Sequence, residues 1–252
     1  MTDELMLKLI TLAEKYETED FIIGDPSYFM HQVEGAENQE VMAFIASVLS
    51  YGSRKQFMPK IQSILDESDG DIYRWTKSGC FSSFFVKDDK TCFYRLYTKG
   101  QMYDFMAAYQ KILVGYGTLG EYLEYKKAGD GFAAVKSICE YFSGEGISVI
   151  IPKDVQSACK RVCMFLRWMV RSGSPVDLGL WSQFIDRRSL IMPMDTHVLH
   201  QAVNLGLLAT KTASMSAARA LTSSLAEVFP EDPLRGDFAL FGLGVNSKSG
   251  SR

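Results

Sequence analysis

Apolar residues recur at helical spacing along nearly the whole chain, and this period limits the possible folds more than any other feature. One face of a helix over 5–16 carries Leu5, Leu9, Leu12 and Ala13. The same spacing indicates further helices at 57–65, 101–114, 118–127 and 131–142, with glycine and proline residues at the breaks. The pattern predicts an all-α fold of about ten helices.

Two other segments are less regular. The nearly all-apolar run 41–49 predicts a central helix that is capped by Asn38 and ends at Tyr51-Gly52-Ser53. The aromatic-rich segment 80–98 is compatible with short strands. Its neighbours are helical, however, so we favour a helix followed by a loop.

Composition excludes several classes of protein. The 252 residues are 47% apolar, which is enough for one large domain or two closely packed ones. The sequence contains no run of 18 apolar residues, so no membrane span is predicted. The first residues also lack the basic and apolar regions of a secretory signal. The five cysteines include no CxxC pair, which argues against a zinc ribbon or a disulfide framework and favours a cytoplasmic protein with reduced thiols.

Charge is distributed unevenly along the chain. Residues 1–50 hold 2 basic and 10 acidic side chains, so the remaining 202 residues hold 25 basic and 20 acidic ones. An acidic protein rarely binds nucleic acid, yet a segregated positive surface could still bind phosphate. On charge alone we favour the simpler interpretation, an acidic and solvated first helix.

The segment Cys159–Arg171 predicts an amphipathic helix with cations on one side. Lys160, Arg167 and Arg171 are 7 and 11 residues apart, so they share one stripe beside an apolar face. Such a helix can line a cleft that receives an anion. The stripe can equally be a solvated surface, and spacing alone favours that alternative.

A second helix start follows at Pro193-Met194-Asp195. The apolar period after Asp195 ends at Gly206, which is typical of a capped helix. Spacing alone therefore favours a structural role for Asp195 as the N-cap, worth about 1 kcal/mol.

Residues 193–207, PMDTHVLHQAVNLGL, resemble a signature of the helix-hairpin-helix DNA glycosylases, which include endonuclease III and the 8-oxoguanine glycosylases. The family's run reads V-D-T-H-V-x-R-x-x-x-R-L-G-L, and its Asp is catalytic. Upstream, AFIASVLSYGSRK (43–55) resembles the family's L-I-A-V-L-L-S-A-Q helix, whose end probes the duplex. The resemblance implies that Asp195 is catalytic and that Tyr51, Gly52, Ser53 and Arg54 contact DNA, with Tyr51 as a wedge that stacks in the gap left by a flipped base. An ordinary helix terminus is an equally good interpretation of these four residues.

Most of the chain also resembles a bacterial family of unknown function. That resemblance is carried by SACKRVCMFLRWMVR (157–171), VDLGLW (176–181), the PMDTHV run and DPLRGDFALFGLG (232–244). The chain departs from the glycosylases in three ways. The hairpin glycines before Lys160 are missing, Leu199 and His200 stand near a usual arginine, and no four-cysteine motif follows, so no iron–sulfur cluster is expected. The separation of 35 positions between Lys160 and Asp195 is more similar to that in the archaeal 8-oxoguanine glycosylases.

The glycosylase resemblance implies base-excision repair of double-stranded DNA, with a damaged purine such as 8-oxoguanine as first candidate substrate. Asp195 would stabilise positive charge on the sugar, and Lys160 would attack C1′ and cleave the strand as an abasic-site lyase. Further DNA contacts are expected from Arg161, Arg167 and His197. The fold expected is two helical lobes around a cleft, one at 38–190 and the other combining 1–37 with 191–252.

No metal or cofactor is expected. His197 and His200 are three residues apart, and His31 is the only other histidine. The alternative function is a catalytically inactive nucleic-acid-binding or interaction protein that retains the glycosylase fold.

Overall fold

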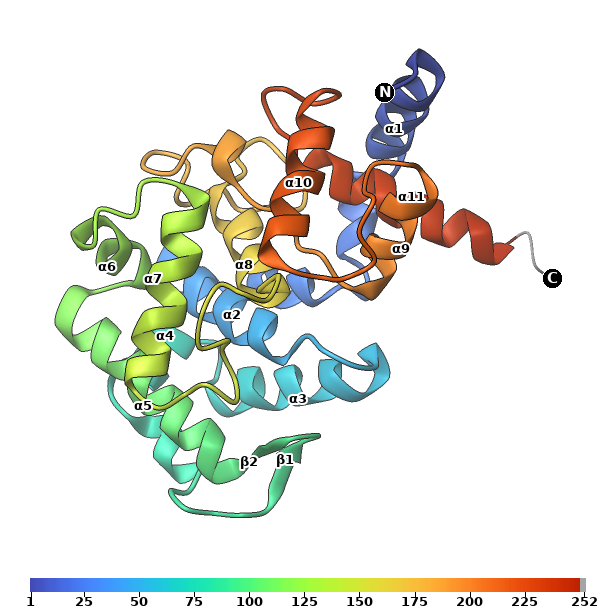
Figure 1. The fold of residues 1–252 in the computed structure, drawn as a ribbon. Helices are drawn as coiled ribbons and strands as arrows, with labels where there is room; N and C mark the ends of the chain where they lie inside the picture. The colour runs from blue at the N-terminus through green and yellow to red at the C-terminus, as the bar shows by residue number, and fades with distance from the viewer. Residues whose placement is uncertain (250–252) are drawn as a thin grey trace. The chain divides into compact units, whose positions relative to one another are not determined.

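The computed structural model describes residues 1–249, with side chains up to Gly244. The protein is mostly helical, with one small hairpin of strands (Figure 1). Among the described residues, no helix is long and apolar enough to cross a bilayer. Contacts between residues divide the chain into two units. The first unit holds residues 1–23, 130–135 and 155 onward, and the second holds 24–129 and 136–154.

The first unit is built from helices at both ends of the chain. It contains α1 (Asp3–Tyr16), η1 (Glu19–Ile22), α8 (Lys160–Val170), η4 (Arg187–Ser189), α9 (Thr196–Asn204), α10 (Met215–Ala226) and α11 (Arg235–Ser249). Helix α11 packs closely on α1 and α9. Gly242 permits this approach to α1, because a Cβ atom there would overlap the ring of Tyr16. Thr2 begins α1 by accepting the Leu5 amide at 3.3 Å, a side-chain N-cap.

The second unit surrounds α2 (Ala36–Leu49), in which every residue from Glu40 to Leu49 is buried. Around it lie η2 (Pro26–His31), α3 (Arg54–Glu67), α4 (Ile72–Lys77), η3 (Cys80–Ser83), α5 (Lys99–Tyr116) and α6 (Leu119–Tyr125). The Phe44 ring lies 5.0 Å from Tyr109 and 5.5 Å from Phe142, which forms an aromatic core. Helix α7 (Gly131–Gly144) begins in the first unit and continues in the second.

The predicted helices are confirmed, but two local predictions are wrong. Asn38 lies inside α2, which begins after Gly35, and its side-chain oxygen accepts the Tyr73 amide at 2.8 Å. The segment 80–98 contains the antiparallel strands β1 (Cys92–Tyr94) and β2 (Tyr97–Thr98) after a short η3. Aromatic side chains hold this hairpin against the second unit, since Phe93, Tyr94 and Tyr97 are all buried.

The division of the chain also differs from the expected lobes 38–190 and 1–37 with 191–252. Helix α8 lies in the first unit together with α9, so Lys160 and Asp195 belong to one unit. Residues 24–37, expected beside the C-terminal helices, pack instead in the second unit, where η2 contacts α2.

Candidate functional site

Lys160 is the first residue of α8. The helix forms because one of its faces is apolar and almost completely buried. This face carries Val162, Phe165, Leu166 and Met169. Cys159 precedes it with φ +45° and ψ +38°, a left-handed conformation that a residue with a side chain adopts at a cost of about 1–2 kcal/mol. The turn at Cys159 thus sets the direction in which the chain enters α8.

Asp195 ends a buried extended segment and begins α9. The backbone of Met192 is fixed by a 2.9 Å hydrogen bond to the hydroxyl of Thr222 on α10. Asp195 Oδ1 then accepts the amides of His197 and Val198, both at 2.9 Å. The predicted N-cap is therefore confirmed, and it occupies only one of the two carboxylate oxygens.

The second oxygen of Asp195 binds Lys160. Lys160 Nζ lies 2.9 Å from Asp195 Oδ2, and the two side chains are 35% and 38% exposed. Burial raises the pKa of Asp195, but the charge and hydrogen bond of Lys160 and the two α9 amides outweigh it, so the pKa lies below its usual value. The pair consists of an ionised carboxylate and an amine that solvent, and therefore a ligand, can reach.

Asp237 on α11 is a third member of this site. Its carboxylate binds Arg167 and is close enough for the charges of Lys160 and Asp195 to influence it. Burial raises the pKa of Asp237 despite the charges of Arg167 and Lys160. Asp237 therefore lies within electrostatic range of the Lys160–Asp195 pair, while its own ion-pair partner is Arg167.

Arg167 and Arg171 are not available to an external anion. Their side chains are 4% and 2% exposed. Arg167 binds Asp177 and Asp237, and Arg171 binds Asp177, Asp232 and Glu17. Neither predicted alternative for the stripe, an anion-binding cleft or a solvated surface, holds for these two arginines. The burial also argues against the DNA contact predicted for Arg167, because binding phosphate would require breaking its internal ion pairs.

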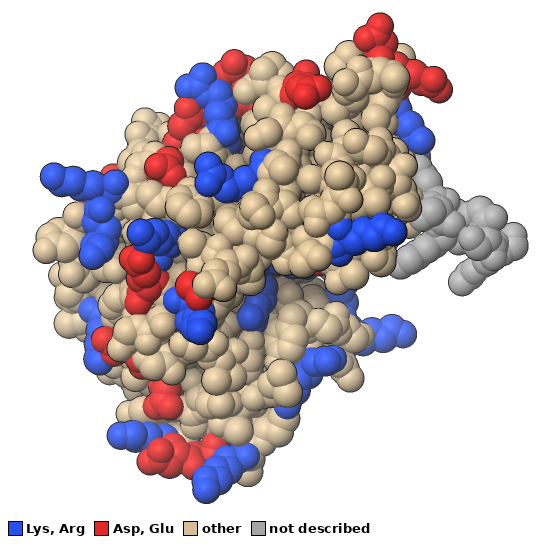
Figure 2. All heavy atoms as spheres, viewed as in Figure 1, with Lys and Arg blue, Asp and Glu red and all other residues tan. Residues whose placement is uncertain are grey.

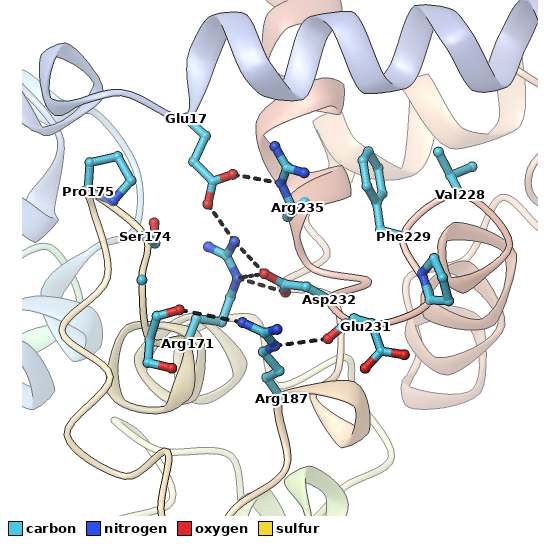
Figure 3. Close-up of a pocket in the computed structure, with 13 residues that line it drawn as sticks. Glu17, Arg171, Ser174, Pro175, Arg187, Val228, Phe229, Glu231, Asp232 and Arg235 are labelled. Atoms are coloured by element: carbon cyan, nitrogen blue, oxygen red, sulfur yellow. Dashed lines mark hydrogen bonds and ion pairs between the residues drawn. The ribbon is translucent and has the colours of Figure 1, made fainter.

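Figure 3 shows where this network reaches the surface. Arg171 lies in a pocket of about 480 Å³ between the end of α1, the loop after α8 and the turn before α11. Asp232 Oδ1 accepts a hydrogen bond from Arg171 Nε at 2.9 Å. The Glu17 carboxylate joins two arginines, since Oε1 lies 2.5 Å from Arg171 Nη2 and Oε2 lies 2.9 Å from Arg235 Nε. Every carboxylate beside Arg171 is paired, so the pocket wall there is a closed ionic network, and neither Lys160 nor Asp195 lines this pocket.

Sequence reasoning missed the carboxylates of this network. Glu17, Asp177, Asp232 and Asp237 were not selected as site residues, although the last three lie in the segments that define the family resemblance. A signal was available, because arginines on an otherwise apolar helix must find carboxylates if they are buried.

The other predicted DNA contacts of the first unit differ in exposure. Arg161 is half-buried beside Lys160. His197 is an exposed residue whose imidazole lies against α11, where a Cβ atom at Gly244 would overlap it. Their contacts with DNA stay predictions.

Residues 51–54 lie in the second unit, at the junction of α2 and α3. The Tyr51 ring packs against Tyr94 and Tyr97 at 5.0 and 5.1 Å. Gly52 has φ +83° and Ser53 precedes α3. Arg54 is 52% exposed and pairs with Asp25 at 3.3 Å. The structure brings these four residues together, but Tyr51 supports the hairpin and is not free to act as a wedge.

The one face that Figure 2 draws carries both cationic and anionic side chains. Among the described residues, no group of three or more His, Cys, Asp or Glu side chains is arranged to hold a metal ion.

Comparisons with known proteins identify a family but no activity. No curated protein and no solved structure matches the chain. One family model, described as "Protein of unknown function (DUF2400)", matches residues 25–246. This match includes α8, Asp195 and Asp237 and covers most of the sequence. The chain belongs to the DUF2400 family.

Proposed function

We propose that the protein is a DNA base-excision N-glycosylase with abasic-site lyase activity, acting through Lys160 and Asp195. The observation that carries the proposal is the 2.9 Å contact between Lys160 Nζ and Asp195 Oδ2, from residues 35 positions apart. It is the pairing that the resemblance to helix-hairpin-helix glycosylases requires.

The geometry supports a role for Asp195 in bond cleavage. Breaking the bond between a base and its sugar places positive charge on C1′ and the ring oxygen, and an ionised carboxylate stabilises that charge. Asp195 is held in the ionised form by Lys160 and the amides of α9. Its orientation is fixed through Oδ1, so Oδ2 can face a substrate without loss of the cap.

Lys160 supplies the nucleophile. After the Lys160 ammonium group gives a proton to solvent, Nζ attacks C1′ and the new C–N bond forms. The base departs with the glycosidic electron pair and takes a proton from solvent. The sugar ring then opens, its oxygen takes a proton, and an imine joins Lys160 to C1′. Loss of a C2′ proton from this imine expels the 3′ phosphate and cleaves the strand. The base itself must first leave the stack, at a cost of a few kcal/mol.

Trapping with borohydride tests the proposal, because hydride reduces the imine to a stable amine. We expect a covalent adduct between the wild-type protein and a duplex bearing 8-oxoguanine or an abasic site, and none with Lys160→Gln. Lys211→Gln, an exposed lysine of the same unit, is the matched control and should form the adduct.

The variant Asp195→Asn separates catalysis from structure. Asparagine caps helices as well as aspartate does, so the protein should keep its stability. Loss of the charge should slow base release at least about a hundredfold. If duplexes with a range of lesions give no adduct and no base release, the proposal fails. An inactive DNA-binding protein is then the remaining interpretation if these duplexes still bind.

A further inference from the structure

The pocket beside Arg171 contains two further arginines whose donor groups are not all in use. Its volume of about 480 Å³ is that of a site for a small molecule, and all of its lining residues belong to the first unit. In Figure 3 the guanidinium groups of Arg235, Arg171 and Arg187 lie one above the other between the loop 172–175 and the turn 228–232. Arg171 is fully engaged by carboxylates, so the other two arginines determine what the pocket can bind.

Arg187 carries a charge that no described carboxylate pairs with. Its Nε donates to the carbonyl oxygen of Glu231 at 2.9 Å and its Nη1 to that of Ser172 at 3.5 Å, so it joins the two walls through neutral acceptors. The preceding carboxylate, Asp186, pairs with Arg188 instead. Because Arg187 is half-buried, a counter-ion from outside the protein would stabilise its charge.

Arg235 has donors to spare as well. Among the described residues, its Nε alone has a hydrogen-bond partner, Glu17 Oε2 at 2.9 Å, and its guanidinium lies over the Phe229 ring at 5.5 Å. Glu17 and Asp232, by contrast, accept arginine donors on both of their oxygens. The pocket therefore has surplus donors, while the acceptors of these two carboxylates are already in use, which suits a ligand that consists of acceptors.

The loop after α8 adds backbone donors to this set. Ser172, Gly173 and Ser174 line the pocket, and their amides donate to no acceptor among the described residues. Glu231, the lining carboxylate outside the network, is 74% exposed and lies 3.9 Å from Arg188. Guanidinium groups together with consecutive amides are typical surroundings of a phosphate group, whose three terminal oxygens accept more donors than the two of a carboxylate.

The turn before α11 supplies an apolar wall, formed by residues 228–230. We infer that this pocket binds a small organic phosphate. Arg187, Arg235 and the amides of the loop hold the phosphate group, and the organic part of the ligand lies against the turn. This site goes beyond the proposed function and does not depend on it, because the Lys160–Asp195 pair does not line the pocket.

Isothermal titration calorimetry with phenyl phosphate tests the inference. We expect the wild-type protein to bind it with a dissociation constant below about 1 mM. Benzoate, which carries a carboxylate on the same ring, should bind at least about tenfold more weakly. Inorganic phosphate should also bind about tenfold more weakly, because it leaves the apolar wall uncovered. Equal affinity for benzoate overturns the assignment to phosphate, and equal affinity for inorganic phosphate overturns the organic ligand.

Two variants test whether this pocket is the site. Arg187→Gln removes the unpaired charge and should weaken binding of phenyl phosphate about ten- to a hundredfold. Arg235→Lys keeps a cation beside Glu17 but loses the unused guanidinium donors, so it should also weaken binding. Arg219→Gln is the matched control, because Arg219 belongs to the same unit, has no described ion-pair partner and lies outside this pocket. It should bind as wild type.

Melting curves followed by circular dichroism separate lost binding from lost folding. If Arg187→Gln does not fold, Arg235→Lys decides, and an unchanged affinity in that variant overturns the inference. Absence of binding by the wild-type protein at millimolar phenyl phosphate overturns it as well. So does an equal loss of affinity in Arg187→Gln and Arg219→Gln, because the phosphate would then bind to surface arginines in general.

Discussion

Replacing Arg171 by methionine should destabilise the protein strongly, and the contacts show which partner is responsible. Arg171 binds three carboxylates, and two of them still have a cationic partner when Arg171 is replaced. Asp177 remains paired with Arg167 at 3.2 Å, and Glu17 with Arg235 at 2.9 Å. Asp232 has no other ion-pair partner among the described residues, and its side chain is only 12% exposed. A buried charge that loses its partner costs about 3–5 kcal/mol, a large part of a typical folding free energy.

Urea unfolding followed by circular dichroism measures this cost. We expect Arg171→Met to lower the free energy of unfolding by about 3–5 kcal/mol. Adding Asp232→Asn to Arg171→Met should restore about 1–2 kcal/mol, because it removes the orphaned charge. Arg188→Met is the control: Arg188 is 58% exposed and its pair with Asp186 lies at the surface, so its loss should cost less than about 1 kcal/mol. If Arg171→Met costs no more than the control, or if Asp232→Asn worsens it, the argument from the orphaned carboxylate is refuted.

Four further variants test other features. Glu17 has a pKa below its usual 4.5, because the charge and hydrogen bonds of Arg171 and Arg235 outweigh the effect of burial. Its contribution to stability is therefore present above pH 4.5 and is lost as the pH falls through the folded pKa, so acid titration of Glu17→Gln should show a shallower loss of stability than wild type. The buried Tyr109 hydroxyl makes no hydrogen bond, so Tyr109→Phe should leave the melting temperature unchanged or raise it; a clear fall would contradict this. In the same urea assay, Gly242→Ala should lower the free energy of unfolding by about 1–3 kcal/mol, because the added methyl group overlaps Tyr16. Gly115→Ala should raise it by about 0.5–1 kcal/mol, because a Cβ atom there has no neighbour within 4 Å.

The helices could be predicted because their signals are local. The apolar period of α1 and α5 and the capping aspartate of α9 each depend on residues within a few positions. The hairpin β1–β2 could not be predicted in this way. Its strands have three and two residues, and what fixes them is the distant Tyr51, 43 positions before Tyr94.

The partners of α8 show a similar limit. Spacing correctly placed Lys160, Arg167 and Arg171 on one stripe, but the period of a helix does not say whether a stripe faces solvent or other charges. The answer depends on Glu17 and Asp232, which are 154 and 61 positions away from Arg171. Buried ion pairs between distant segments are therefore the part of this site that sequence spacing could not reveal.

The contrast along α8 also bears on the proposal that Lys160, and neither arginine of the stripe, is the nucleophile. Arg167 and Arg171 lie toward the end of the helix, and the carboxylates that surround them leave them almost no exposed surface. Lys160 begins the helix, remains 35% exposed and has the exposed oxygen of Asp195 as its ion-pair partner. A guanidinium keeps its proton at any ordinary pH and cannot act as a nucleophile, whereas an amine can once it is deprotonated. The same stripe therefore has two roles: the arginines bind α8 to α11 and the preceding turn, and this fixed framework holds Lys160 against Asp195.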